Sequence, residues 1–341
     1  MNKIIRIGDH EVGGLRTFVV AEIGSNHMQD LQRAKAHIDA ARTAGADAVK
    51  FQSIQLEALY FDPDPDTRLF IQKLEMEERW HQILKDYCDE LGIVFFSSPT
   101  YLRAVEVMEE VDVALYKLAS AQIGTFPQLV KRVARTGKPV LFSTGLVTLP
   151  GVERLVQVFR ACGNDQFIVL HCNSLYPTPP ARVHLPLILA YAQCFGNPVG
   201  FSDHTLDIHI PIAAVALGAR VIEKHFTLDS TLPSPDAAFA LEPDRFAEMV
   251  RGIRAVEEAV RGEARFGVDP EAQRFRDSIR TRLVLKHEKK AGAHFSAADF
   301  MFLRHHEGID CRDLDFILER QGKAREDLPA KSLLTWEQVC F

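Results

Sequence analysis

Eight short apolar runs, rich in valine, isoleucine and phenylalanine, recur along the chain at intervals long enough to hold a helix. They lie at 18–24, 48–52, 93–99, 115–120, 139–145, 167–172, 198–203 and 221–226. Residues between the runs show helical spacing, as in Leu31, Ala34, Ile38 and Ala41. Eight strand-then-helix units over about 260 residues favour an α/β fold of the (β/α)8 TIM-barrel type. If one or two runs are instead buried helix or loop, an open doubly wound sheet remains.

The last 60 or so residues differ in character from the rest. A weak internal repeat relates 291–300 to 330–339, and each copy places Ser296 or Thr335 before a short helical turn, with Gln338 at capping-box spacing from Thr335. The pattern predicts a barrel over 1–265, a polar linker over 266–280 and a small C-terminal domain over 281–341. Such a small domain buries little core alone, so we expect it to dock on the barrel or on a partner subunit.

Each apolar run ends in polar residues, which is where a TIM barrel carries its active site. Because side chains alternate along a strand, Lys50 and Gln52 share one face, as do Ser202 and His204, and Glu223 and His225. The residues that close the runs are Glu22, Lys50, Gln52, Ser97, Ser98, Lys117, Ser120, Ser143, Thr144, His171, Ser174, Ser202, His204, Glu223 and His225.

The types of these residues point to two kinds of binding. Two lysines among serines are typical of an anion pocket, because ammonium groups neutralise a phosphate while hydroxyls and amides bind its oxygens. A single serine or lysine at a strand end is more often an ordinary loop residue, so the prediction depends on the whole group. His204 and His225, on neighbouring strand ends, are candidate ligands of a shared divalent metal. His171 lies between Leu170 and Cys172 and is predicted to be structural.

Charge and cysteine usage exclude several other classes of protein. A net charge of −6 and a pI near 6.1 give no basic surface for nucleic acid. The six cysteines form no C-x-x-C pair, which favours reduced thiols over disulfides or a zinc site. The first residues turn charged too early for a signal peptide, and no run reaches the roughly 20 apolar residues of a membrane span. We therefore expect a cytoplasmic protein that interacts with neither membrane nor nucleic acid.

Six stretches, at 21–27, 45–52, 142–145, 171–179, 201–205 and 222–225, carry a specific resemblance. With them the chain resembles the sialic acid (N-acetylneuraminate) synthase family, which includes legionaminic and pseudaminic acid synthases. The tail resembles the antifreeze-like (SAF, β-clip) domain of that family, with Arg304 in the place of its Arg-Pro motif and Gly308-Ile309 after it. The resemblance covers the whole barrel, and the combination of motifs is far more specific than any one of them.

The resemblance implies a phosphoenolpyruvate-dependent transferase. Such an enzyme condenses phosphoenolpyruvate with open-chain N-acetylmannosamine or a related N-acetylated hexose, and gives a nine-carbon 2-keto sugar acid and phosphate. It further implies that His204 and His225 hold Mn²⁺ or Mg²⁺, which activates the sugar aldehyde as a Lewis acid, and that two chains form a domain-swapped homodimer in which Arg304 reaches the sugar.

The implied roles fall into two further sets. Glu22, Gln52 and Glu223 are the implied catalytic residues, with Glu22 as the candidate for proton handling. The implied substrate-binding residues are Lys50, Ser98, Lys117, Ser120, Ser143, Ser174, Tyr176, Ser202, Asp236 and Arg304.

Four residues depart from the family pattern, in regions that would contact the sugar. Gln29 replaces a frequent glycine, Ala237 and Ala240 replace a frequent histidine and serine, and His305 replaces the proline after Arg304.

Two other functions stay open. A lysine-dependent aldolase is one alternative, since Lys50 or Lys117 in a barrel could form a Schiff base. A non-catalytic sugar-binding or assembly protein is the other, although both lysines and both histidines are retained.

Overall fold

The computed structural model describes residues 3–261 and 266–341. The chain divides into two compact units, Met1–Arg261 and Gly262–Phe341, which are described separately below. The predicted end of the barrel at residue 265 falls outside the described residues. Within the described ranges, no helix is long and apolar enough to cross a membrane.

The first unit is built around an eight-stranded parallel sheet, so the TIM-barrel prediction is confirmed. Seven neighbouring pairs are hydrogen-bonded in the order β5-β4-β3-β10-β9-β8-β7-β6, and the end strands β5 and β6 also lie in contact, with Ser98 Oγ donating to the Lys117 carbonyl oxygen at 3.4 Å. The strands are β3 (Phe18–Gly24), β4 (Ala48–Ser53), β5 (Val94–Pro99), β6 (Tyr116–Leu118), β7 (Val140–Ser143), β8 (Phe167–Cys172), β9 (Val199–Asp203) and β10 (Val221–His225).

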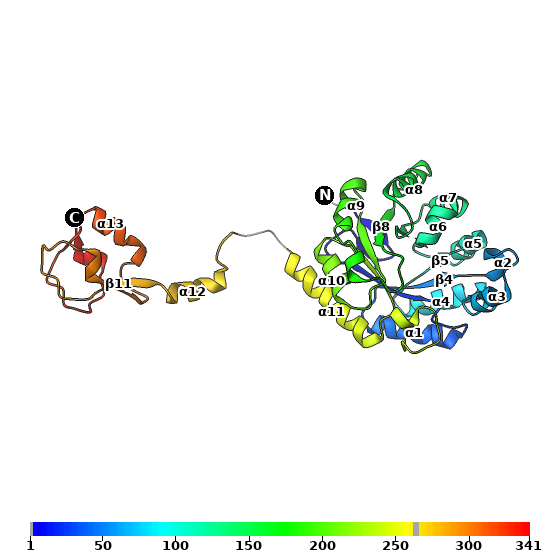
Figure 1. The fold of residues 1–341 in the computed structure, drawn as a ribbon, viewed down its shortest axis with the longest axis horizontal. Helices are drawn as coiled ribbons and strands as arrows, with labels where there is room; N and C mark the ends of the chain where they lie inside the picture. The colour runs from blue at the N-terminus through cyan, green and yellow to red at the C-terminus, as the bar shows by residue number, and fades with distance from the viewer. Residues whose placement is uncertain (1–2, 262–265) are drawn as a thin grey trace. The chain divides into compact units, whose positions relative to one another are not determined.

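Helices alternate with these strands and lie around the outside of the sheet (Figure 1). The first begins where Asp30 accepts hydrogen bonds from the backbone amides of Gln32 and Arg33, a side-chain N-cap. The helices are α1 (Leu31–Thr43), α2 (Leu56–Leu59), α3 (Pro65–Gln72), α4 (Glu78–Leu91), α5 (Leu102–Glu110), α6 (Ser120–Thr125), α7 (Pro127–Ala134), α8 (Leu149–Ala161), α9 (Leu187–Phe195), α10 (His209–Ala216) and α11 (Pro243–Val260), with 3-10 turns at Pro180–Arg182 and Ala237–Phe239.

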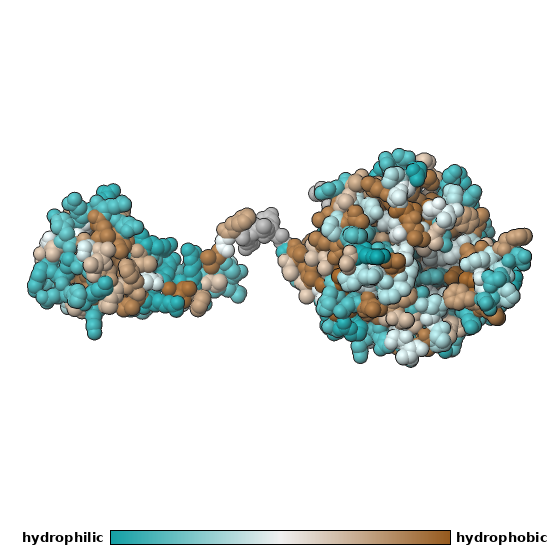
Figure 2. All heavy atoms as spheres, viewed as in Figure 1, coloured by the Kyte–Doolittle hydropathy of each residue, from teal (hydrophilic) through white to brown (hydrophobic). Residues whose placement is uncertain are grey.

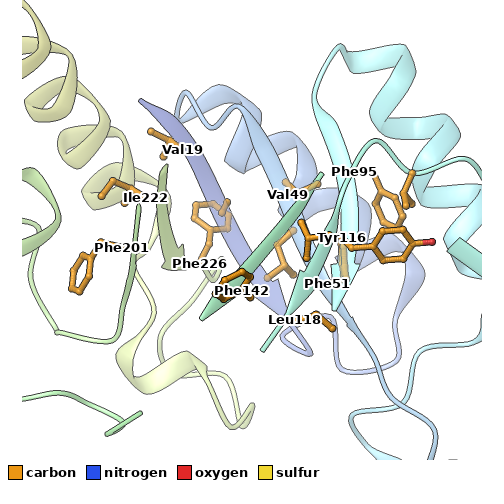
Figure 3. Close-up of a cluster of buried hydrophobic side chains, with 14 of the residues drawn as sticks. Val19, Val49, Phe51, Phe95, Tyr116, Leu118, Phe142, Phe201, Ile222 and Phe226 are labelled. Atoms are coloured by element: carbon orange, nitrogen blue, oxygen red, sulfur yellow. The ribbon is translucent and has the colours of Figure 1, made fainter. Parts of the chain in front are cut away.

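Strand alternation separates the core into two layers. Outward-facing side chains such as Val19, Phe51 and Phe142 pack with the helices in the larger cluster, part of which is shown in Figure 3. Inward-facing residues at the beginnings of the strands, such as Val20 and Leu141, form a second cluster. Strands such as β3, β7 and β8 contribute to both layers, as alternation predicts.

A hairpin that the sequence did not predict completes the inner layer. β1 (Ile5–Ile7) pairs antiparallel with β2 (His10–Val12), and Ile5, Ile7 and Val12 are buried against Phe18, Ala48 and other residues of the inner cluster. Apolar side chains thus fill the barrel interior at the N-terminal end of the strands. The inward positions nearer the C-terminal ends are polar, as in Glu22, Lys117 and Ser202.

The second unit has its own small core, formed by Leu283, Phe295, Ile317 and other buried residues. Its elements are α12 (Pro270–Ser278), β11 (Thr281–Leu285), β12 (Phe300–Arg304), α13 (Leu314–Glu319), β13 (Lys323–Ala324) and β14 (Val339–Cys340), with 3-10 turns at Ala297–Asp299, Cys311–Asp313 and Trp336–Gln338.

The predicted internal repeat in this unit is confirmed. Ser296 with Asp299 and Thr335 with Gln338 form capping boxes, each followed by a short strand. α12 lies within the predicted linker 266–280, so much of that segment is helical. Polar side chains cover much of the unit's visible surface (Figure 2). Phe302, Phe316 and Trp336 are nevertheless exposed.

Candidate active site

A cavity of about 340 Å³ opens at the C-terminal ends of the barrel strands. Its position is the one expected from the fold. Nine of the sixteen lining residues lie in the strands, four lie in the segments that follow β6, β8 or β9, and the other three come from the segment after β10. The lining residues are Glu22, Lys50, Gln52, Lys117, Ala119, Ser120, Ser143, Cys172, Tyr176, Ser202, His204, Glu223, His225, Pro235, Asp236 and Phe239.

A network of buried charges occupies one side of the cavity. Lys117 Nζ donates to Glu223 Oε1 at 2.6 Å, and Ser202 Oγ donates to the same oxygen at 3.0 Å. Lys50 Nζ lies 2.9 Å from Glu22 Oε2 and 3.8 Å from Glu223 Oε1. All four charged side chains are at least nine-tenths buried. Two ammonium groups and two carboxylates therefore interact where little water screens them.

The environment separates the pKa values of the two carboxyl groups. Burial raises the pKa of Glu22 to about 7, against the opposing effect of Lys50. Burial acts in the same direction on Glu223, but Lys117 and Lys50 outweigh it and lower its pKa to about 2. Near neutral pH, Glu22 can therefore exchange a proton while Glu223 stays ionised. Paired carboxyl groups with separated pKa values are typical of acid–base chemistry.

The two imidazoles lie side by side at the ends of β9 and β10, with ring centroids 5.2 Å apart. His204 Nδ1 donates to the Asn173 carbonyl oxygen at 2.7 Å, which leaves Nε2 as the ligand atom. Burial lowers the pKa of His204 to about 4 and that of His225 well below its usual value. Both rings are therefore neutral at physiological pH, which is the state that binds metal.

An acidic side chain lies close to this pair. His225 Nδ1 is buried, lies 3.5 Å from Asp236 Oδ2 and makes no hydrogen bond within the described ranges. Gly24 allows this approach, because its φ is +56° and a Cβ there would lie 2.9 Å from Asp236 Oδ2. Burial raises the pKa of Asp236 to about 6. Two neutral imidazoles beside a carboxyl group are a donor set that fits a divalent transition metal.

A group of small polar residues lies at the ends of β7 and β8 and in the segments that follow, next to β6, which carries Lys117. Ser120 Oγ donates to the Ser143 carbonyl oxygen at 3.2 Å and accepts from the Gly145 amide at 3.0 Å. Ser143 Oγ and Ser174 Oγ are buried and make no hydrogen bond to the described residues. A Cβ on Gly145 would overlap Ser174 Oγ. The Ser143 hydroxyl lines the cavity without a partner among the described residues and is therefore suited to bind an oxygen of an anion.

Of the fifteen residues to which the sequence analysis gives a catalytic, binding or metal-ligating role, twelve line the cavity and three are not among its lining residues. Ser98 is buried at the end of β5 and bonds to the Lys117 backbone. Ser174 lies behind Gly145. Arg304 is exposed at the end of β12 in the second unit. His171 is buried, with Nε2 2.5 Å from the Val183 carbonyl oxygen, which supports its predicted structural role.

The sequence prediction missed four lining residues: Ala119, Cys172, Pro235 and Phe239. Cys172 closes β8 and occupies the inward position two residues after Leu170, so strand alternation alone could have identified it. Pro235 and Phe239 follow β10 in a segment with a 3-10 turn. The ring of Phe239 lies 4.9 Å from that of His225, a contact that no periodic pattern signals.

The chain is similar in sequence to several sugar acid synthases. A model described as the NeuB family matches residues 37–265. The human N-acetylneuraminate-9-phosphate synthase is 37% identical over 73% of this chain and 73% of its own length. The N,N'-diacetyllegionaminic acid synthase of Campylobacter jejuni is 34% identical over 86% of this chain and 92% of its own length.

A solved structure agrees with these matches. The N-acetylneuraminic acid (sialic acid) synthetase of Leptospira borgpetersenii superposes with a TM-score of 0.75 at 30% identity, covering 81% of this chain and 96% of that one. The shared fold and the shared sequence therefore point to the same group of proteins.

Proposed function

The chain belongs to the NeuB family, and from that premise we propose that it is a nonulosonic acid synthase. It condenses phosphoenolpyruvate with open-chain N-acetylmannosamine or a related N-acetylated hexose to give a nine-carbon 2-keto sugar acid and phosphate. The new carbon–carbon bond joins the enol methylene to the aldehyde carbon, and water is consumed as phosphate leaves. The observation that carries the proposal is one buried cavity lined by two lysines, two neutral imidazoles and two carboxyl groups with separated pKa values.

Phosphoenolpyruvate would bind on the side of the cavity that carries the lysines and serines. Lys117, Ser120 and Ser143 supply an ammonium group and hydroxyls, and Lys50 and Ser202 lie on neighbouring strands. Ser98 and Ser174 do not line the cavity, so their contribution would be to orient the lysine and the Gly145 turn. Charge-assisted contacts of this kind bind phosphate strongly in a site that excludes water.

His204 and His225 would hold a divalent cation, with Asp236 beside them. When bound, that ion would supply Lewis-acid polarisation of the aldehyde oxygen. Nitrogen donors favour Mn²⁺ over Mg²⁺ at equal availability. Tyr176, whose ring centroid lies 4.2 Å from that of His204, would pack against the sugar.

Glu22 would handle the proton that the aldehyde oxygen gains during condensation. Its pKa of about 7 suits a group that gives and recovers a proton near neutral pH. Gln52 Nε2 donates to Glu22 Oε1 at 2.9 Å and so fixes its orientation. Glu223, held ionised by Lys117, would keep both lysines charged.

The second unit would be an antifreeze-like domain that completes the sugar site of a partner chain in a domain-swapped homodimer. Its capping boxes, its own small core and the exposed Arg304 support this proposal. All six cysteines are free, as expected in a reducing compartment, and we place the enzyme in the cytoplasm.

A phosphate-release assay tests the reaction. The purified chain would be incubated with phosphoenolpyruvate, Mn²⁺ and one of a panel of sugars: N-acetylmannosamine, its 6-phosphate and bacillosamine-type sugars. Phosphate release that requires both a sugar and the enzyme, with the matching nine-carbon acid detected by mass spectrometry, is expected. Phosphate release without sugar, or none with any sugar, would contradict the proposal.

A borohydride trap separates this function from a lysine-dependent aldolase. Burial lowers the pKa of Lys117, a property of Schiff-base lysines. Treatment with pyruvate and borohydride should nevertheless leave the chain unlabelled, because the proposed reaction has no imine. Covalent labelling of Lys50 or Lys117 would favour the aldolase.

A further inference from the structure

A second buried ion pair lies directly behind the two imidazoles, on the opposite face of the same strands. Asp203 and Lys224 are direct cross-strand partners on β9 and β10. By strand alternation they point outward, away from the cavity, while their neighbours His204 and His225 point inward. The side chains of both are fully buried, and Lys224 Nζ lies 2.6 Å from Asp203 Oδ2.

This pair holds the turn that carries His204. Asp203 accepts hydrogen bonds from the Thr205 amide at 2.9 Å and from Thr205 Oγ1 at 3.0 Å. Lys224 Nζ donates to the Thr205 carbonyl oxygen and, at 3.3 Å, to that of Asp207. Both peptide groups of Thr205 are therefore tied to the pair, immediately after His204. Through Lys224, the turn is fixed to the strand that carries His225.

Stability of the barrel does not by itself require this arrangement. Burying two charges costs free energy that their attraction only partly offsets, and a well-packed apolar pair often holds a core equally well. An apolar pair cannot, however, bind the amide and carbonyl groups of the turn at 205–207. The distinctive contribution of the ion pair is the position of that turn relative to β10.

We propose that Asp203 and Lys224 are positioning residues that fix the backbone of His204 against that of His225, so that both imidazoles meet one divalent cation. The hydrogen bond from His204 Nδ1 to Asn173 sets the rotation of the ring, and the ion pair sets the place of its backbone. Outer partners of metal ligands typically change metal affinity by about 10- to 100-fold. The inference rests on the proposed function, because it assumes that these histidines hold a metal.

The test measures binding of MnCl₂ alone to the full chain by isothermal titration calorimetry, so no turnover is needed. The double variant Asp203→Asn/Lys224→Met removes both charges and keeps approximate volume. We expect it to fold, with a cooperative thermal transition, and to bind Mn²⁺ at least about 10-fold more weakly than wild type. The single variant Asp203→Asn, which is isosteric, should weaken binding in the same direction.

A matched ion pair at the other end of the barrel serves as the control. Asp47 directly precedes β4, and its Oδ2 lies 3.0 Å from Arg254 Nη2. Asp47→Asn/Arg254→Met should lower the melting temperature and leave Mn²⁺ affinity unchanged. Loss of affinity in both double variants would mean that binding follows general stability, and would overturn the positioning role.

The remaining outcomes are also decisive. Wild-type Mn²⁺ affinity in a folded Asp203→Asn/Lys224→Met variant overturns the positioning role and leaves the proposed function untouched. Failure of both Asp203 variants to fold, while the control folds, assigns the pair to the stability of the barrel and overturns it too. No Mn²⁺ binding by the wild-type chain would instead refute the metal site of the proposed function.

Discussion

Lys117 Nζ and Glu223 Oε1 are 2.6 Å apart in the cavity, although 106 residues separate them in sequence. The carboxylate keeps a buried lysine charged, whereas burial alone lowers the pKa of its ammonium group. An incoming phosphate would therefore meet a lysine that is already charged. The phosphate would compete with Glu223 for this ammonium group, so a stronger Lys117–phosphate contact would weaken the Lys117–Glu223 ion pair.

Replacement of Lys117 tests this role. Lys117→Met should raise the KM for phosphoenolpyruvate by about 10- to 100-fold, because a hydrogen bond to a charged group contributes about 1.5–3 kcal/mol. The KM for the sugar should change far less. Steady-state kinetics with each substrate varied in turn gives both values, and Lys131→Met, on an exposed position of α7, is the control. An equal change in both KM values would show that Lys117 is structural or catalytic.

Removal of the metal should abolish turnover. Excess chelator should eliminate phosphate release, and Mn²⁺ or Mg²⁺ should restore it. His225→Ala should lower kcat by about 10²-fold or more, since a Lewis acid contributes several kcal/mol to the transition state. His209→Ala, which changes an exposed histidine, should have no effect. Full activity in excess chelator would remove the metal from the mechanism.

The raised pKa of Glu22 predicts a specific pH dependence of stability. Its pKa is about 7 in the folded protein and about 4.5 when unfolded, so between these values the folded state binds more protons. The contribution of Glu22 to stability is therefore complete below about pH 4.5 and is lost as pH rises through 7. Glu223, with a pKa of about 2, acts in the opposite direction at lower pH.

The variant Glu22→Gln isolates this effect, because the buried histidines, whose lowered pKa values also make stability depend on pH, are present in both proteins. The melting temperature of Glu22→Gln, relative to wild type, should rise between pH 5 and pH 8. Differential scanning calorimetry without metal or substrate measures it. A difference that stays constant over this range would show that Glu22 is ionised throughout and does not handle the proton.

Local patterns were enough to predict the eight strands. The inward face of each strand changes from apolar to polar near its C-terminal end, as from Val20 to Glu22 and from Leu141 to Ser143. That change marks both the strand and the active site. Patterns failed where elements are short. The β1–β2 hairpin consists of two three-residue strands interrupted by charges, and it is recognised only by the packing of Ile5, Ile7 and Val12 under the barrel.

The site was predictable as a set of residues but not as a network. Alternation identifies Lys50, Lys117 and Glu223 as inward-facing, yet which lysine pairs with which carboxylate depends on strand order and side-chain rotamers. The separation of the two carboxyl pKa values follows from that pairing. The outward pair Asp203–Lys224 was overlooked because charged residues on the helix-facing side of a strand follow no motif.

In the proposed domain-swapped dimer, each active site needs residues from both chains. Arg304 is exposed at the end of β12, so its guanidinium is free to contact the N-acyl or hydroxyl oxygens of a sugar in a partner's barrel. Arg304→Ala should raise the KM for the sugar and leave phosphoenolpyruvate binding nearly unchanged.

Mixing Arg304→Ala chains with His225→Ala chains tests whether Arg304 contacts the sugar bound in the partner's barrel. Half of the dimers would be mixed after full exchange, and each would hold one site with both groups intact. Activity should therefore recover to about a quarter of wild type in a twofold-symmetric dimer. No recovery after verified subunit exchange, or a fully active monomer, would rule out the swapped arrangement.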